Sequence, residues 1–96
     1  MDLALQHKEK IIEICRQNDI SYCALFGSYA RAEATEKSDI DLLVRFAKPK
    51  SLLGHIGVTH QLEDALGKEV DLVTEKELSS LIRDNVLRDL RVIYGA

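Results

Sequence analysis

Two stretches of the sequence decide the fold: LFGSYAR at residues 25–31 and SDIDLLV at residues 38–44. The first closes an apolar run over residues 21–26 that stops at Gly27, which is typical of a buried strand running into a tight turn. The second begins a strand over residues 39–46, whose alternate residues separate into two faces. One face is formed by Ile40, Leu42, Val44 and Phe46, and the other by Asp39, Asp41, Leu43 and Arg45.

Hydrophobic periodicity and turn residues assign the rest of the chain. The predicted elements are a helix over residues 3–18 capped by Asp2, a strand over 21–26, a short helix over 29–34, a polar loop over 35–38, a strand over 39–46, a helix over 52–66 ended by Gly67, a strand over 69–74, a helix over 75–90 with a possible break, and a last segment, 91–94. The last segment is either a short strand or a tail that pairs only with a partner. This order predicts an α/β (α+β) fold, in which helices cover a mixed sheet of three to four strands.

The helices are expected to face the sheet through apolar stripes. The predicted stripes are Leu5, Ile11, Ile12 and Cys15 in the helix over 3–18, and Leu52, Ile56, Leu62 and Leu66 in the helix over 52–66. Cys15 and Cys23 are separated by seven residues, which is neither a CxxC pair nor a zinc pattern. Both cysteines are therefore predicted to be reduced thiols buried in the core.

Length and composition indicate one globular domain over residues 1–96. Of the 96 residues, 46% are hydrophobic and 30% are charged, and the net charge is −3. A slightly acidic domain gains little from neutralising phosphates, so direct nucleic-acid binding is not expected. The apolar run over 22–26 is far shorter than the roughly 20 residues that span a bilayer, and residues 1–20 show no signal segment. A cytoplasmic protein that does not enter membranes is expected.

Asp39 and Asp41 are the first candidate site residues. Residues two apart in a strand point to the same face, so these carboxylates would repel each other unless a cation lay between or in front of them. Carboxylate oxygens are the ligands that Mg²⁺ prefers. Asp71, in the strand over 69–74, joins them if that strand lies beside the strand over 39–46. Three carboxylates around one or two metal ions suit in-line phosphoryl or nucleotidyl transfer.

Gly27 and Ser28 are the second candidate site. A glycine-serine turn between a strand and a helix presents free backbone N–H groups, which suit a phosphate. Arg31, three residues after Ser28, lies on the same helical face and can reach the same anion. Each feature alone has an ordinary structural explanation, such as a simple helix cap or a solvated strand residue. The ordered set of all of them is specific.

This ordered set resembles the minimal nucleotidyltransferases of the DNA polymerase beta superfamily. Their pattern is Gly-Ser, ten residues, Asp-x-Asp and a later strand aspartate, and residues 29–38 supply the ten. The words around Gly27, around Asp39 and around Asp71 look like those of the MNT-type antitoxins found beside HEPN-domain toxins. The resemblance covers the chain from its first helix to its last predicted strand.

The resemblance implies a function and a role for each residue. Gly27 and Ser28 would bind the phosphates of ATP, with Arg31 as a helper. Asp39, Asp41 and Asp71 would be both the catalytic residues and the ligands of Mg²⁺, with two ions expected. AMP would pass to a tyrosine hydroxyl of a co-encoded HEPN RNase toxin, which would silence the toxin. The partners implied are ATP and the toxin, and a homodimer or a hetero-oligomer stays open.

Two other functions remain open at this point. The domain could neutralise a partner by complex formation alone, or it could transfer a nucleotide to a small molecule or an RNA. One departure from the family pattern bears on activity: many relatives have glycine where this chain has Ala32. If that position is left-handed, Ala32 is strained.

Overall fold

The computed structural model describes residues 5–78 and 80–95, and within them four strands form one mixed sheet. The strands are β1 (Ile20–Phe26), β2 (Ile40–Phe46), β3 (Val70–Thr74) and β4 (Arg91–Tyr94), in the order β3-β2-β1-β4. β1 is antiparallel to β2 and to β4, whereas β2 and β3 are parallel. A parallel pair needs a crossover connection, and α3 (Leu52–Leu66) supplies it.

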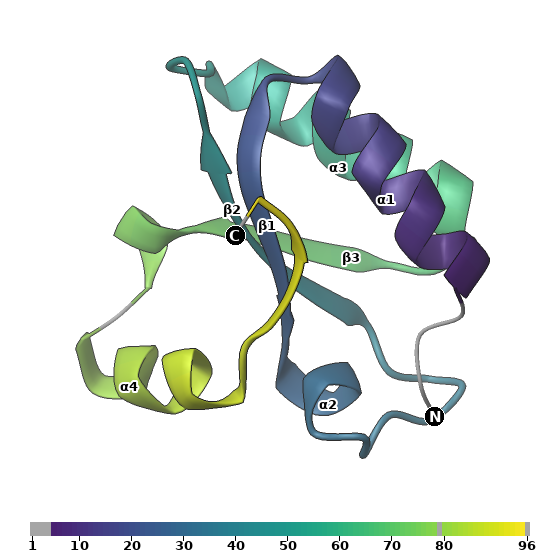
Figure 1. Cartoon of the computed structure of the whole chain (residues 1–96), viewed down its shortest axis with the longest axis vertical. Helices are drawn as coiled ribbons and strands as arrows, with labels where there is room; N and C mark the ends of the chain where they lie inside the picture. The colour runs from purple at the N-terminus through teal and green to yellow at the C-terminus, as the bar shows by residue number, and fades with distance from the viewer. Residues whose placement is uncertain (1–4, 79, 96) are drawn as a thin grey trace.

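The helices form two groups around this sheet. α1 (Leu5–Gln17) and α3 lie side by side and cover one face, as Figure 1 shows. The one-turn helix α2 (Gly27–Ala30) and α4 (Ser80–Asp89) lie together, away from that layer (Figure 1). A single 3-10 turn, η1 (Glu75–Glu77), separates β3 from α4, so the break predicted within 75–90 is confirmed. Residues 91–94 pair with β1, which settles the last segment as a strand.

The core lies between the sheet and the layer formed by α1 and α3. Its fully buried side chains include Ile11, Cys15, Cys23, Ile40, Leu42, Val44 and Leu62. Both cysteines are free and buried, as predicted. A hydrogen bond to Cys15, followed by burial, raises the pKa of Cys23 far above its ordinary value, so its thiol keeps its proton. None of the helices in the described ranges is long and apolar enough to cross a membrane.

The predicted helical stripes were partly wrong. Leu5 and Leu52 are 72% and 76% exposed, Ile56 is also exposed, and Ile14 is buried where Ile12 is only half-buried. α3 is apolar on more than one side, and packing on the sheet selects the stripe Val58, Leu62 and Leu66. The short helix predicted over 29–34 is one turn that starts earlier, at Gly27. Asp2, the predicted cap of the first helix, lies outside the described residues.

The second face of the sheet carries both buried and polar residues. Leu43 is buried at 1% exposure although it shares this face with Asp41, and it lies opposite Ala24, which is fully buried. α4 contacts β1 on this side of the chain. A polar group on this face is therefore partly shielded from water. This shielding contributes to the raised pKa of Asp41 described below.

Candidate active site

Gly27 and Asp41 meet where β1 ends. In the antiparallel β1–β2 register Phe26 lies opposite Asp41, so the turn that follows Phe26 runs alongside the Asp41 side chain. Gly27 has φ +71°, and a β-carbon there would overlap Asp41 Oδ2 and lie 3.0 Å from Asp41 Cγ. A side chain at residue 27 would therefore be strained by its backbone and would displace the carboxylate. Glycine is the residue that this contact requires.

Asp41 and Asp71 are direct neighbours on parallel strands. The β2–β3 register pairs them residue to residue, so their side chains leave the same face and their Cα atoms are about 4.8 Å apart. Asp39 lies two residues before Asp41, just outside β2, which begins at Ile40 rather than at residue 39 as predicted. Asp39 and Asp71 are exposed, whereas Asp41 is half-buried. The fold thus brings the three predicted aspartates to one end of two neighbouring strands.

The charge of Asp41 is strongly affected by this arrangement. Burial, followed by the neighbouring carboxylates of Asp71 and Asp39, raises the pKa of Asp41 to about 6, and Arg31 opposes the rise. The causes are the loss of water around a carboxylate and repulsion by two like charges. A cation placed beside Asp41 would relieve both.

The three aspartates have the donor chemistry for a divalent cation. Carboxylate oxygens are hard ligands, and Mg²⁺ is usually bound by one or two of them, with waters and substrate phosphates completing its shell. Among the described residues, no three His, Cys, Asp or Glu side chains are already arranged as a metal cluster. The observation that fits a cation here is the placement of the half-buried Asp41 beside Asp71 on one face of the sheet, where burial and the neighbouring carboxylates disfavour its charge and raise its pKa.

Ser28 and Arg31 follow Gly27 on α2 and the residues after it. Ser28 is half-buried, and its carbonyl accepts a hydrogen bond from Glu33 N–H at 2.8 Å, which closes the turn. Arg31 donates to Glu33 Oε2 at 3.2 Å and lies 4.0 Å from Asp89 Oδ2. The Arg31 guanidinium also lies near enough to Asp41 to oppose the rise of its pKa. An anionic ligand would have to replace the contacts of Arg31 with the exposed Glu33 and the half-buried Asp89.

Ala32 has φ +58°, so its backbone is left-handed. This conformation places the methyl group of an L-residue too close to the following carbonyl. Strain is expected at Ala32 if its backbone is left-handed, and the structure shows that the backbone is left-handed.

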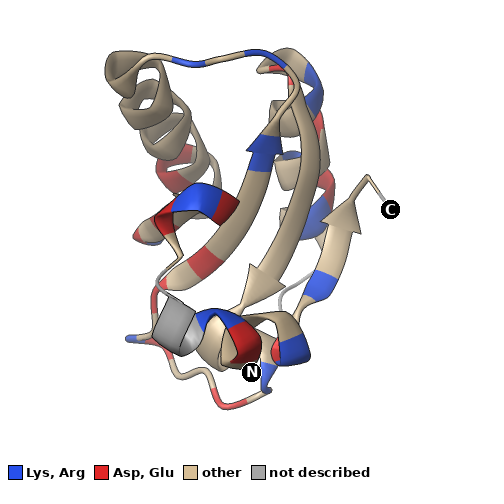
Figure 2. Cartoon of the chain, turned by 90° about the vertical axis from the view of Figure 1, so that its left-hand side faces the viewer, with Lys and Arg blue, Asp and Glu red and all other residues tan. Residues whose placement is uncertain are grey.

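Sequence reasoning missed the surroundings of Asp71. A groove of about 500 Å³ lies between α3 and β3, and Asp71 lines it together with His55, His60 and Glu77. His55 and His60 are five residues apart, a spacing that is not typical of a metal pair, and nothing in the linear sequence places His55 beside β3. In Figure 2 the first turns of α3 carry no charged residues, and its acidic residues lie near its end.

Comparison with known proteins shows which family the chain resembles in sequence. The family model described as "Polymerase beta, Nucleotidyltransferase" matches residues 9–96. A chain of Thermococcus cleftensis, named protein adenylyltransferase MntA, is 43% identical over 88 residues, which are 92% of this chain and 84% of the relative.

Solved structures give the same result in three dimensions. A crystal structure of a toxin–antitoxin pair with AMP-PNP matches with a TM-score of 0.81 and 28% identity, over 93% of this chain and 73% of the other. A structure of a tri-AMPylated Shewanella oneidensis HEPN toxin in complex with an MNT antitoxin matches with a TM-score of 0.73 and 27% identity, over 94% and 71%. The predicted α/β fold with a mixed sheet is thereby confirmed.

Proposed function

The chain belongs to the polymerase beta nucleotidyltransferase family, and from this premise we propose that it is a protein adenylyltransferase that acts as an antitoxin. It transfers AMP from ATP to a tyrosine hydroxyl of a HEPN-domain toxin. The observation that carries this proposal is the juxtaposition of the Gly27 turn with Asp41 and its register neighbour Asp71. The toxin complexes of its structural relatives and the bound AMP-PNP of one of them support the choice of acceptor and of nucleotide.

Each candidate residue has a role that its position supports. The backbone N–H groups at Gly27 and Ser28 would hold the terminal phosphates of ATP, because an α2 turn without side chains at its start admits them closely. Arg31 would exchange its contacts with Glu33 and Asp89 for a phosphate. Asp39, Asp41 and Asp71 would hold two Mg²⁺ ions, which when bound supply the positive charge that the triphosphate and Asp41 both lack.

The reaction is an in-line substitution at the α-phosphorus. The tyrosine oxygen forms the new bond to that phosphorus, the bond to the oxygen bridging the α- and β-phosphates breaks, and pyrophosphate leaves. The hydroxyl proton passes to a carboxylate. Asp71 is the best placed acceptor of that proton, because it is exposed and lines an open groove, whereas Asp41 is half-buried.

Label transfer tests the proposal. The chain is mixed with ATP labelled at the α-phosphate, Mg²⁺ and the product of the neighbouring gene, alongside the Asp39→Asn/Asp41→Asn variant. The control is Asp64→Asn/Asp84→Asn, which removes the same charge from two exposed residues outside the site. Label on the partner with wild type and control, but not with the site variant, is the expected result.

The other outcomes separate the remaining functions. Label that persists with the Asp39→Asn/Asp41→Asn variant contradicts the proposed site. A stable complex that suppresses the toxin without any label contradicts transfer and indicates a binding module. Label on RNA or a small molecule instead of the protein contradicts the proposed acceptor.

A further inference from the structure

β3 is at the edge of the sheet, yet three of its outward backbone groups are bound by side chains. Ile40 N–H donates to Glu69 O at 3.0 Å, so the odd-numbered residues here turn their backbone groups toward β2. In a parallel strand the alternate residues direct their backbone groups away from the neighbouring strand. The backbone N–H and C=O groups of Val70, Leu72 and Thr74 therefore point out from the sheet edge, although the side chains of Val70 and Leu72 are buried. Asp71 lies between two of them.

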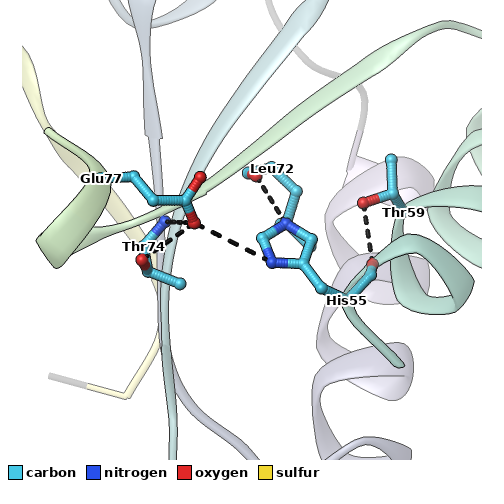
Figure 3. A network of polar contacts seen from close by, with 5 residues as sticks. All are labelled: His55, Thr59, Leu72, Thr74 and Glu77. Atoms are coloured by element: carbon cyan, nitrogen blue, oxygen red, sulfur yellow. Dashed lines mark hydrogen bonds and ion pairs between the residues drawn. The ribbon is translucent and has the colours of Figure 1, made fainter. Parts of the chain in front are cut away.

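Three side chains each bind one backbone group of these residues, on the side of β3 where a further strand would pair. Glu63 Oε2 accepts from Val70 N–H at 3.0 Å, and His55 Nε2 donates to Leu72 O at 2.8 Å. Glu77 Oε1 accepts from Thr74 N–H at 3.2 Å and from Thr74 Oγ1 at 2.9 Å. Figure 3 shows the part of this arrangement around His55 and Glu77. We call His55, Glu63 and Glu77 the edge clamp.

His55 is the central member of the edge clamp. Its side chain is 19% exposed, and its ring lies edge-on to Phe46 with centroids 6.0 Å apart. A carbonyl can only accept, so Nε2 carries the proton and Nδ1 faces Glu77 Oε1 at 3.9 Å. His55 therefore connects α3, the backbone of β3 and η1 through one ring, and the bond to Leu72 stands directly beside Asp71.

We infer that the edge clamp positions Asp71 for the reaction, with His55 as its main positioning residue; this rests on the proposed function. A reacting carboxylate must be held to within a fraction of an ångström. β3 has a neighbouring strand on one side only, and a slip of one residue would turn Asp71 to the opposite face. The residues on both sides of Asp71 are fixed from the open side by Glu63 and His55, which prevents such a shift.

Three variants test His55. His55→Phe keeps a ring but removes the donor, and His55→Gln keeps an N–H donor at the place of Nε2. His60→Phe is the matched control, because His60 is exposed on the same helix and lines the same groove. For AMP transfer we expect His55→Phe to lower kcat at least tenfold with the KM for ATP unchanged within twofold. His55→Gln stays within threefold of wild type, and His60→Phe equals wild type.

Amide hydrogen exchange supplies a readout that does not need catalysis. In His55→Phe the amides of residues 70–74 should exchange at least tenfold faster, while those of α1 and β1 keep their protection. Faster exchange throughout the chain would indicate a general loss of stability and overturn the inference. Equal losses of kcat in His55→Phe and His55→Gln, or faster exchange at 70–74 with unchanged kcat, would also overturn it.

A second pair keeps the test open if His55→Phe does not fold. Glu63→Ala removes the acceptor for Val70 N–H, whereas Glu63→Gln retains a carbonyl in its place. We expect Glu63→Ala to lower kcat and to speed amide exchange at residues 70–74, as His55→Phe does, whereas Glu63→Gln should stay close to wild type in both. If wild type itself transfers no label, the proposed function fails. Faster amide exchange confined to residues 70–74 in the His55→Phe or Glu63→Ala variant would still show that the edge clamp holds β3.

Discussion

The Asp41 carboxylate lies directly against the Cα of Gly27, with no room between them for a β-carbon. The turn that would hold phosphates and the aspartate that would hold their counter-ion are thus one packed unit. Changes to either residue should affect both functions.

Gly27→Ala should therefore abolish activity. The methyl group would displace the Asp41 side chain, and φ +71° costs an L-residue roughly 1–2 kcal/mol. We expect AMP transfer to fall at least a hundredfold and the free energy of unfolding to fall by about 1–2 kcal/mol or more. Label transfer and urea unfolding measure the two effects.

Gly57→Ala is the matched control for that substitution. Gly57 lies within α3, and a β-carbon there meets nothing within 4 Å. Alanine should stabilise the helix by roughly 0.5–1 kcal/mol and leave transfer unchanged. Should the two alanine variants behave alike, the contact between Gly27 and Asp41 would not matter for activity.

Asp41→Asn should stabilise the metal-free protein at neutral pH. The pKa of Asp41 is about 6 in the folded chain against 3.8 ordinarily, so the folded state binds the proton more tightly. Stability therefore falls as pH rises from about 4 to about 6, and the asparagine variant escapes this loss. After allowance for solvent screening, the gain at pH 7.5 is on the order of 1 kcal/mol.

Thermal unfolding from pH 4 to pH 8, in the presence of a chelator, checks this prediction. The melting temperatures of wild type and Asp41→Asn should coincide near pH 4, separate progressively between about pH 4 and pH 6, and differ by a constant amount above that. Asp84→Asn, an exposed change on α4, should follow wild type throughout. A constant difference between wild type and Asp41→Asn at every pH would contradict the charge-based explanation.

AMP transfer should lose rate on acidification. At limiting Mg²⁺ the rate should decline below pH 6, about tenfold per pH unit, as Asp41 takes up a proton. Protons and a bound cation compete for the same carboxylate, so a higher Mg²⁺ concentration should move the midpoint to lower pH. Rates measured across pH at two Mg²⁺ concentrations test this prediction. If the midpoint of the pH profile does not change with Mg²⁺ concentration, Asp41 is not a ligand of the cation.

Ala32→Gly should stabilise the chain. Ala32 has φ +58°, which glycine adopts without strain, although glycine also loses more freedom on folding. The net gain should be roughly 0.5–1 kcal/mol, or a few degrees in melting temperature for a chain of this size. In contrast, Ala65→Gly, within α3, should lower the free energy of unfolding by roughly 0.5–1 kcal/mol, because glycine destabilises a helix. A loss of stability in Ala32→Gly would show that the left-handed backbone there is not strained.

The chain order of the elements was predictable because local patterns determine it. The alternation of Asp39 to Phe46 predicted β2, and Gly67 predicted the end of α3, where it has φ +68°. The register of Asp41 with Asp71 could only be proposed, since nothing local states which strands become neighbours. The resemblance to a known family supplied that step.

Two features depend on tertiary packing and could not be predicted from the sequence: the buried stripe of α3 and the contact of His55 with β3. α3 has apolar residues on several sides, so periodicity alone selected Leu52 and Ile56, although Val58 faces the sheet. His55 is an isolated histidine in the sequence, and its partner is a main-chain carbonyl, which leaves no pattern of residue types to detect.

The crossover from β2 through α3 to β3 also has a consequence for synthesis. Asp41 and Asp71 are thirty residues apart in the chain and become neighbours only when the parallel pair closes. Such non-local pairing is a slow part of folding, because the intervening chain must be ordered first. A nascent chain still on the ribosome therefore has no complete site until Thr74 has emerged. Prematurely terminated products that lack β3 would have no complete site for the proposed AMP transfer.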